Sequence, residues 1–126
     1  MKSGKGPAAA APPGRTVLCR LADVADGGSN GFAVHWRGEL RRFMIVRRND
    51  HVFVYANRCP HAGLPLDFTP GRFLDLAKTH ILCTNHGAVF RIEDGFCVSG
   101  PCAGTSLRRP ATEVLNGTVY LVACIS

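Results

Sequence analysis

Two short segments of the sequence each place one cysteine close to one histidine. The segment "NRCPHAGLPLDFTP", residues 57–70, contains Cys59 and His61, and "ILCTNHGAVF", residues 81–90, contains Cys83 and His86. Thiolate and imidazole ligands suit zinc or the irons of an iron–sulfur cluster, and they suit calcium and magnesium poorly. The four side chains together therefore predict a site for zinc or iron.

The spacing of these residues bears on the choice between the two metals. Zinc fingers usually supply their cysteines as one closely spaced pair and their histidines as a second pair on a helix. Here each segment supplies one residue of each kind, which fits a [2Fe–2S] cluster in which two cysteines bind one iron and two histidines the other. A zinc site made by the same four residues, and a chance placing of surface histidines and core cysteines, remain as alternatives.

At these residues the sequence resembles the Rieske family. Cys59-Pro60-His61-Ala62-Gly63 is similar to the first ligand loop of that family, and Cys83-Thr84-Asn85-His86-Gly87 is similar to the second. "GPCAGTSL", residues 100–107, resembles the proline-bearing third loop near the cluster, and the resemblance extends over roughly residues 15–125. It implies a Rieske-type [2Fe–2S] cluster whose ligands are Cys59, His61, Cys83 and His86.

The resemblance also implies a low reduction potential. Family members of respiratory complexes have a further cysteine in each ligand loop, and these two form a disulfide. They also have a serine and a tyrosine that donate hydrogen bonds to the cluster sulfurs. In this chain Leu64 and Asn85 stand at the cysteine positions, and Ala88 and Phe90 stand at the serine and tyrosine positions. Fewer hydrogen bonds then stabilise the more negative reduced cluster, so the potential is expected at the low end of the Rieske range.

The segments around the motifs predict an all-β fold, because short runs of Val, Ile, Phe and Tyr alternate with turn formers and no helical periodicity persists. The resemblance makes this a Rieske-like antiparallel β-sandwich with an inserted cluster-binding subdomain over about residues 57–103. Strands are expected at 16–21, 32–37, 40–48 and 51–57, with "DGGSNG" as a turn, and a hairpin over 112–125 is expected to turn at Asn116-Gly117. Strands from both ends of the chain are expected to form the base.

The stretch between the two ligand loops is longer than the resemblance implies. Twenty-one residues separate His61 from Cys83. Residues 72–83 are expected to form a strand, a turn and a second strand, and such a hairpin absorbs extra length at little entropic cost.

Composition places further bounds on the chain. Residues 1–14 are expected to be a flexible tail, since they contain two lysines and many Ala, Pro and Gly but no Leu, Ile, Val or Phe for a secretory signal, and residues 15–125 a single domain. No apolar run is long enough to span a membrane. The protein is therefore expected in the cytoplasm. There, Cys19 and Cys124 are expected to be buried, and Cys97 and Cys102 to be thiols rather than a disulfide.

The net charge of +6 comes mostly from arginines, several of them in adjacent pairs. Most are expected to be solvated, and the excess favours a partner with an acidic surface. No nucleic-acid-binding motif accompanies them, so no specific nucleic-acid partner is expected.

The function expected from the resemblance is that of a Rieske-type ferredoxin, which carries single electrons from a reductase to a terminal oxygenase or another redox enzyme. A chain of 126 residues leaves no room for a second domain with its own catalytic cofactor, so it is expected to be an electron carrier rather than an enzyme. One alternative is a Rieske-like small subunit of a larger reductase, such as nitrite reductase. The other is a zinc-stabilised binding module.

Overall fold

Within the described residues, the regular structure consists of nine strands and one 3-10 turn. The computed structural model describes residues 14–58, 66, 73–83 and 87–122. The strands are β1 (Arg15–Arg20), β2 (Ser29–Trp36), β3 (Glu39–Arg48), β4 (His51–Ala56), β5 (His80–Cys83), β6 (Ala88–Arg91), β7 (Cys97–Ser99), β8 (Thr112–Leu115) and β9 (Thr118–Val122). A 3-10 turn, η2 (Leu21–Asp23), follows β1.

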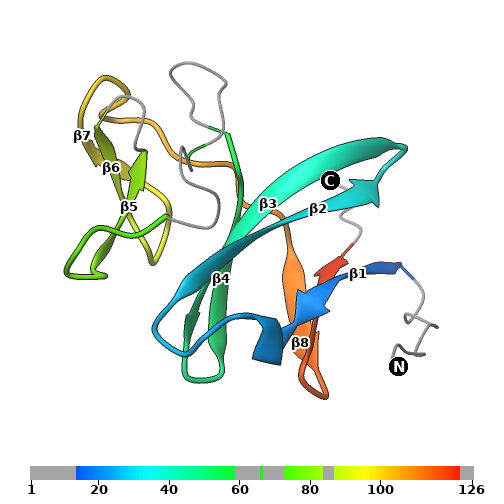
Figure 1. The fold of residues 1–126 in the computed structure, drawn as a ribbon. Helices are drawn as coiled ribbons and strands as arrows, with labels where there is room; N and C mark the ends of the chain where they lie inside the picture. The colour runs from blue at the N-terminus through cyan, green and yellow to red at the C-terminus, as the bar shows by residue number, and fades with distance from the viewer. Residues whose placement is uncertain (1–13, 59–65, 67–72, 84–86, 123–126) are drawn as a thin grey trace.

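The strands form three antiparallel sheets of three strands each, with the orders β1-β9-β8, β2-β3-β4 and β5-β6-β7. The first sheet joins the two ends of the described chain, as the sequence predicts. Figure 1 shows the β5-β6-β7 sheet on one side of the long β2-β3-β4 meander and the β1-β9-β8 sheet on the other. The prediction of an all-β fold is confirmed.

The middle sheet is buried on both faces, because β3 and β4 contribute to two separate hydrophobic cores. Phe43, Ile45 and Val54 pack with residues of β1 and β9. Met44 and Tyr55 point the other way and pack with residues of the β5-β6-β7 sheet. This arrangement explains why "FMIV" in β3 is an unbroken apolar run instead of an alternating one.

Two of the hairpin connections have positive φ at residues that tolerate it, Asn and Gly. Asn49 turns β3 into β4 with φ 57°, and Asn116 and Gly117 turn β8 into β9 with φ 50° and 77°. Positive φ at both central positions is the geometry of a two-residue type I′ hairpin. The hairpin expected at Asn116-Gly117 is therefore present.

Two expectations about local structure are wrong. Residues 26–31 are not wholly a turn, because β2 already begins at Ser29, where the long partner strand β3 extends the pairing to Ser29 and Val46. Residues 73–83 form a hairpin whose first arm is not a strand. This first arm pairs with β5 through the isolated bridge between Leu74 and Ile81. Two hydrogen bonds support the bridge, from Leu82 N to Phe73 O and from Asp75 N to His80 O.

The described helical structure includes no segment long and apolar enough to cross a membrane.

Candidate metal centre

The second cysteine–histidine segment begins at the end of β5 with a buried cysteine. Cys83 has 0% exposure and pairs with Ala88 across β5 and β6. The amide of Gly87 donates a hydrogen bond of 2.8 Å to the carbonyl of Cys83, and Gly87 has a φ of 72° that favours glycine. Cys83 and Gly87, four residues apart, are thus hydrogen-bonded to each other, and the two ends of the second loop lead into the adjacent strands β5 and β6.

The first segment is held at its base by a buried asparagine. The side-chain oxygen of Asn57 accepts a hydrogen bond of 2.7 Å from the backbone N–H of Leu66. The backbone N–H of Asn57 donates to the carbonyl of Arg42 in β3, at 3.0 Å. Asn57 therefore ties the far end of the first loop to β3, the central strand of the middle sheet.

The third loop packs against the strand that follows the second segment. A Cβ placed on Gly100 would lie 2.7 Å from the Cα of Ala88 and 3.2 Å from the carbonyl oxygen of Gly87, and Gly100 has a φ of 99°. Only glycine allows this approach without a shift of backbone. The loop is closed by hydrogen bonds between Cys97 and Thr105 and between Gly104 and Cys97.

Two buried cysteines lie in contact inside this third loop. The sulfurs of Cys97 and Cys102 are 3.2 Å apart, and the Cys97 thiol also lies 3.2 Å from the carbonyl oxygen of Ser99. A disulfide would bring the two sulfurs to about 2.05 Å. The pair is therefore present as two thiols, as expected from the sequence.

One of the four predicted ligands lies within the described part of the chain. Cys83 is described, whereas Cys59, His61 and His86 lie outside it, as do Leu64, Asn85, Cys124 and residues 1–13 of the expected tail. Among described residues no group of three or more His, Cys, Asp or Glu side chains is placed to hold a metal ion. The ligand set stays a prediction.

Three other histidines lie within the described ranges, on strands β2, β4 and β5. His35 and His51 are exposed on strands β2 and β4. His80 lies beside Asp75 and Thr79 in the hairpin, with its Nδ1 3.0 Å from the Thr79 hydroxyl oxygen. Cys19 is also buried, as expected, at 5% exposure.

The described residues fit a metal centre at this end of the molecule. Leu66, Cys83, Ala88, Cys97 and Cys102 belong to one hydrophobic core, so the ends of the first and second segments and the third loop meet there. A thiol buried among apolar groups is an unfavourable place for a bare thiolate. A bound iron would supply the compensating charge, so the burial of Cys83 is compatible with its expected role as a ligand.

Tyr55 links this end of the molecule to the middle sheet. Its hydroxyl donates to the carbonyl of Ile92, and burial raises the pKa of the phenol to about 12, against a smaller opposing effect of Arg109. The ring lies against Gly95, where an added Cβ would come within 2.8 Å of it. This contact is structural: the phenol stays protonated and carries no charge at neutral pH.

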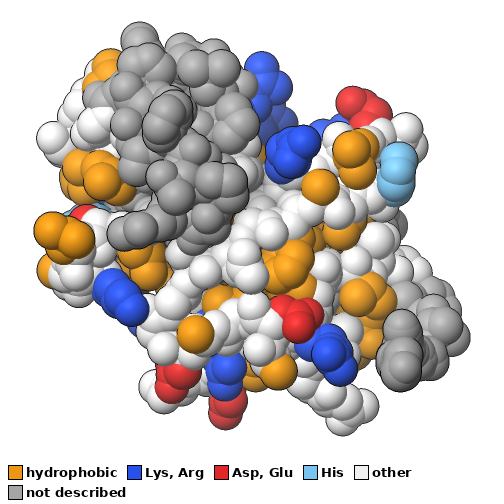
Figure 2. Space-filling view, in the orientation of Figure 1, with side chains coloured by type: hydrophobic (Ala, Val, Ile, Leu, Met, Phe, Trp, Pro, Cys, Tyr) orange, Lys and Arg blue, Asp and Glu red, His pale blue; other side chains and the backbone are white. Residues whose placement is uncertain are grey.

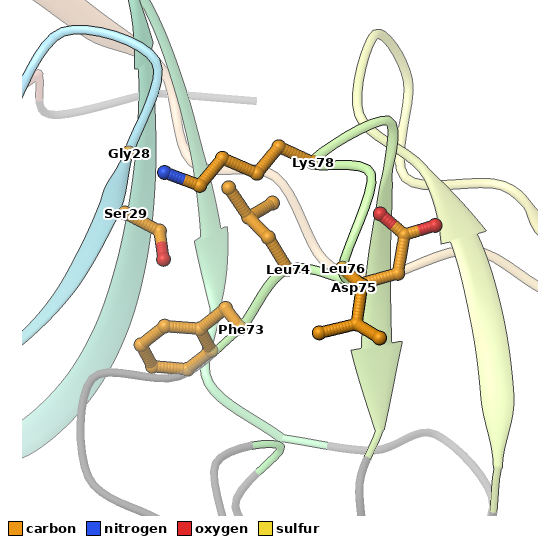
Figure 3. Close-up of a pocket in the computed structure, with 7 residues that line it drawn as sticks. All are labelled: Gly28, Ser29, Phe73, Leu74, Asp75, Leu76 and Lys78. Atoms are coloured by element: carbon orange, nitrogen blue, oxygen red, sulfur yellow. The ribbon is translucent and has the colours of Figure 1, made fainter.

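A separate hollow of about 290 Å³ lies between the start of β2 and the 73–83 hairpin. Gly28 and Ser29 line one side, and Phe73, Leu74, Asp75, Leu76 and Lys78 line the other. Figure 3 shows the Lys78 side chain reaching across toward Gly28 and Ser29. None of the described residues that line the hollow is a cysteine or a histidine.

The sequence reasoning did not single out Asn57 or Gly100 as parts of the site. Asn57 was expected only as the last residue of a strand. A polar side chain directly before a ligand loop can, however, hydrogen-bond to the backbone of that loop and hold it in place. Gly100 appeared only within the third-loop motif. The signal available was Gly100-Pro101, a turn-forming pair, but its contact with Ala88 depends on sheet packing.

Known proteins give a consistent identification of the fold. The model of the Rieske [2Fe–2S] domain matches residues 14–120. The ferredoxin of carbazole 1,9a-dioxygenase from Nocardioides aromaticivorans IC177 aligns with a TM-score of 0.68 and 22% identity over 87% of this chain and 98% of its own. A search of curated proteins found no match.

Two further solved structures show the same fold in different settings. The Sphingomonas yanoikuyae B1 ferredoxin aligns with a TM-score of 0.63 and 25% identity, over 86% of this chain and 97% of its own. The terminal oxygenase of carbazole 1,9a-dioxygenase from Nocardioides aromaticivorans IC177 aligns with a TM-score of 0.69 and 21% identity, over 89% of this chain but 30% of its own. Since the family model spans nearly the whole described fold, the chain belongs to the Rieske [2Fe–2S] domain family and its cofactor is a Rieske-type [2Fe–2S] cluster.

Proposed function

We propose that the protein is a Rieske-type ferredoxin that carries single electrons from a reductase to a terminal oxygenase or another redox enzyme. The observation that carries this proposal is the extent of the structural likeness. The fold accounts for 98% and 97% of two separate ferredoxins, but for 30% of an oxygenase chain. The likeness is thus to the carrier proteins over their whole length.

We infer that Cys59 and Cys83 bind one iron of the cluster and that His61 and His86 bind the other. Support comes from the residue types, from the burial of Cys83 and from the common core beneath the two segments. When bound, such a cluster accepts and releases one electron at a time. The chain's own contribution is to keep the thiolate of Cys83 from water and to hold the loop ends in place through Asn57 and Gly87.

The partners in this proposal are a reductase and an oxygenase. Two solved complexes are described as an oxygenase with a ferredoxin in carbazole 1,9a-dioxygenase, and this chain aligns with chains in both. Location in the cytoplasm is part of the same proposal.

The first experiment is metal and sulfide analysis together with visible absorption and a one-electron redox titration. Two irons and two sulfides per chain, a Rieske spectrum and uptake of one electron are expected. A colourless zinc protein would contradict the proposal. Constant co-purification with a larger reductase would instead favour a fixed subunit.

Ligation is tested by Cys83→Ser, with Cys19→Ser as the matched control. A serine hydroxyl is a far weaker ligand than a thiolate at neutral pH, so Cys83→Ser and Cys59→Ser are expected to lose the cluster. Cys19 lies in the other core, so its substitution is expected to leave the iron content nearly intact. Full iron content in either ligand variant would refute the assignment.

A further inference from the structure

Several arginines of the described chain have no carboxylate partner, although most carboxylates have a cation or backbone partner. Glu39, Glu93, Asp94 and Glu113 form ion pairs with Arg41, Arg48, Arg91 and Arg15. Asp23, Asp26 and Asp75 accept backbone hydrogen bonds. Within the described ranges, no ion pair involves Arg42, Arg58 or Arg108, and all three side chains are exposed. Among the described residues, no carboxylate compensates these three charges.

These three arginines lie together in the fold. The carbonyl of Arg42 accepts the N–H of Asn57, and the carbonyl of Arg108 accepts the N–H of Ala56, at 2.8 Å. Arg58 follows Asn57 directly, and its own N–H bonds to the carbonyl of Ala56. Three separate segments thus converge at the end of β4, and each brings one arginine.

This end of β4 is also where the chain enters the first cysteine–histidine segment. Arg58 directly precedes Cys59 in the sequence. Arg42 is two residues from Met44, and alternation along β3 puts it on the face that packs toward Cys83 and Ala88. Figure 2 shows several Lys and Arg side chains and fewer Asp and Glu side chains on this face of the molecule. By their backbone bonds, the three arginines lie next to the residues that lead into the segment that we expect to hold the cluster.

We propose that Arg42, Arg58 and Arg108 form a docking surface for an acidic patch on the electron-transfer partner. This inference rests on the proposed function, since it concerns how the carrier meets its partner. A cluster of like charges at the base of the expected cluster-binding segment attracts an oppositely charged surface to this end of the molecule. Such steering weakens with added salt, because the charges are exposed.

The test uses the intact, cluster-loaded protein and three variants of equal net charge, Arg42→Glu, Arg108→Glu and Arg20→Glu. Arg20 is exposed on β1 in the opposite sheet and has no ion pair within the described chain, so it is the matched control. Each reduced protein is mixed with ferricyanide, an anionic oxidant, and with hexaammineruthenium(III), a cationic one. Stopped-flow absorption follows the loss of the reduced spectrum at low and high salt.

For Arg42→Glu and Arg108→Glu the rate with ferricyanide at low salt is expected to fall about threefold, and the rate with hexaammineruthenium(III) to rise by a similar factor. Arg20→Glu is expected to change either rate much less, and high salt is expected to remove the differences. Equal effects of all three variants would show that only net charge matters and would overturn the proposal. If a reversal lowers cluster loading, Arg42→Gln and Arg108→Gln provide the same test with a smaller effect.

Competition with added polyanions tests which kind of partner binds the surface formed by these arginines. Poly-L-glutamate, as a model of an acidic protein surface, is expected to slow the reaction of wild type with ferricyanide and to slow Arg42→Glu less. Protection by duplex DNA but not by poly-L-glutamate would overturn the assignment of a protein partner. A protein that transfers electrons to neither oxidant would contradict the proposed function itself, and the docking surface would fall with it.

Discussion

The amide oxygen of Asn57 accepts a hydrogen bond of 2.7 Å from the backbone N–H of Leu66, and both residues are buried. Nine positions apart in sequence, they fix the two ends of the first cysteine–histidine segment to each other. The same Asn57 is bonded through its backbone to β3. Asn57 therefore holds the end of the first segment, which is expected to bind iron, in a fixed position relative to the middle sheet.

Asn57→Ala is expected to destabilise the protein by about 1–3 kcal/mol, because it leaves the buried N–H of Leu66 without its acceptor. The cluster is also expected to be lost faster during incubation with a chelator, since the loop end is no longer held. Urea unfolding and the decay of visible absorption measure the two effects. Asn57→Asp keeps an oxygen that accepts this bond, so its loop is expected to hold the cluster longer than the loop of Asn57→Ala. Equal decay rates for the two variants would show that the bond does not hold the loop.

Gly100 and Gly104 form a natural pair for testing the contact of the third loop. Both have positive φ, 99° and 94°, so alanine adds backbone strain of about 1–2 kcal/mol at either position. At Gly104 an added Cβ meets nothing within 4 Å, whereas at Gly100 it meets the backbone of Ala88 at 2.7 Å. Gly100→Ala is therefore expected to be the more destabilising variant.

The reduction potential of the cluster supplies a second measurement of this pair. Because Ala88 directly follows the second cysteine–histidine segment, movement of its backbone is expected to shift the reduction potential in Gly100→Ala and to leave it unchanged in Gly104→Ala. Equal losses of stability and equal potentials in the two variants would show that the third loop does not constrain the site.

Cys19 provides a prediction about alkaline stability. Burial, with a smaller contribution from Asp23, raises the pKa of this thiol from 9.0 to about 12. A folded-state pKa above the unfolded one favours the folded protein fully below pH 9, and the contribution is lost as the pH rises toward 12. The free energy of unfolding is thus expected to fall over this window.

Urea unfolding of wild type and Cys19→Ala at pH 8 and at about pH 10.5 isolates the effect of the thiol. The variant is expected to be less stable at pH 8, because it leaves a small cavity, but to lose less stability between the two pH values. Tyr55, whose pKa is also raised by burial, is present in both proteins and cancels in the comparison. A pH dependence unchanged by the substitution would contradict the assignment to Cys19.

The sequence predicted those features that depend on local chemistry. The Asn116-Gly117 hairpin followed from residues that tolerate positive φ, and the meander of β2, β3 and β4 followed from short turns between β-forming segments. The start of β2 was misplaced, because Gly27, Gly28 and Asn30 look like turn residues and only pairing with the long strand β3 extends the strand to Ser29.

Features that depend on contacts between segments distant in the sequence could not be predicted from sequence patterns. Arg42, Asn57 and Arg108 come from three segments, and their meeting at the end of β4 depends on backbone bonds between those segments. The approach of Gly100 to Ala88 likewise requires the packing of the third loop on β6. Residue types predicted a metal site, but only the fold shows what supports it.

The last prediction concerns the reduction potential. Ala88 and Phe90 are both fully buried on one face of β6, at the positions where relatives with higher potentials are expected to place hydrogen-bond donors. The wild-type potential is therefore expected near the lower end of the Rieske range, about −150 mV rather than about +300 mV.

Ala88→Ser and Phe90→Tyr are each expected to raise this potential, because a donor stabilises the more negative reduced cluster. A hydrogen bond to a charged group has a net value of about 1.5 kcal/mol. For a one-electron couple this corresponds to roughly 65 mV as an upper limit, and the bond exists in both oxidation states, so the true rise is smaller. Val89→Thr is the control, since Val89 is only partly buried and points to the other face of β6, where an added hydroxyl is expected to leave the potential unchanged. Redox titration followed by visible circular dichroism measures all four proteins. A rise in Val89→Thr equal to that in the other two would show a general effect of polarity, and a wild-type potential above about +100 mV would refute the low-potential assignment.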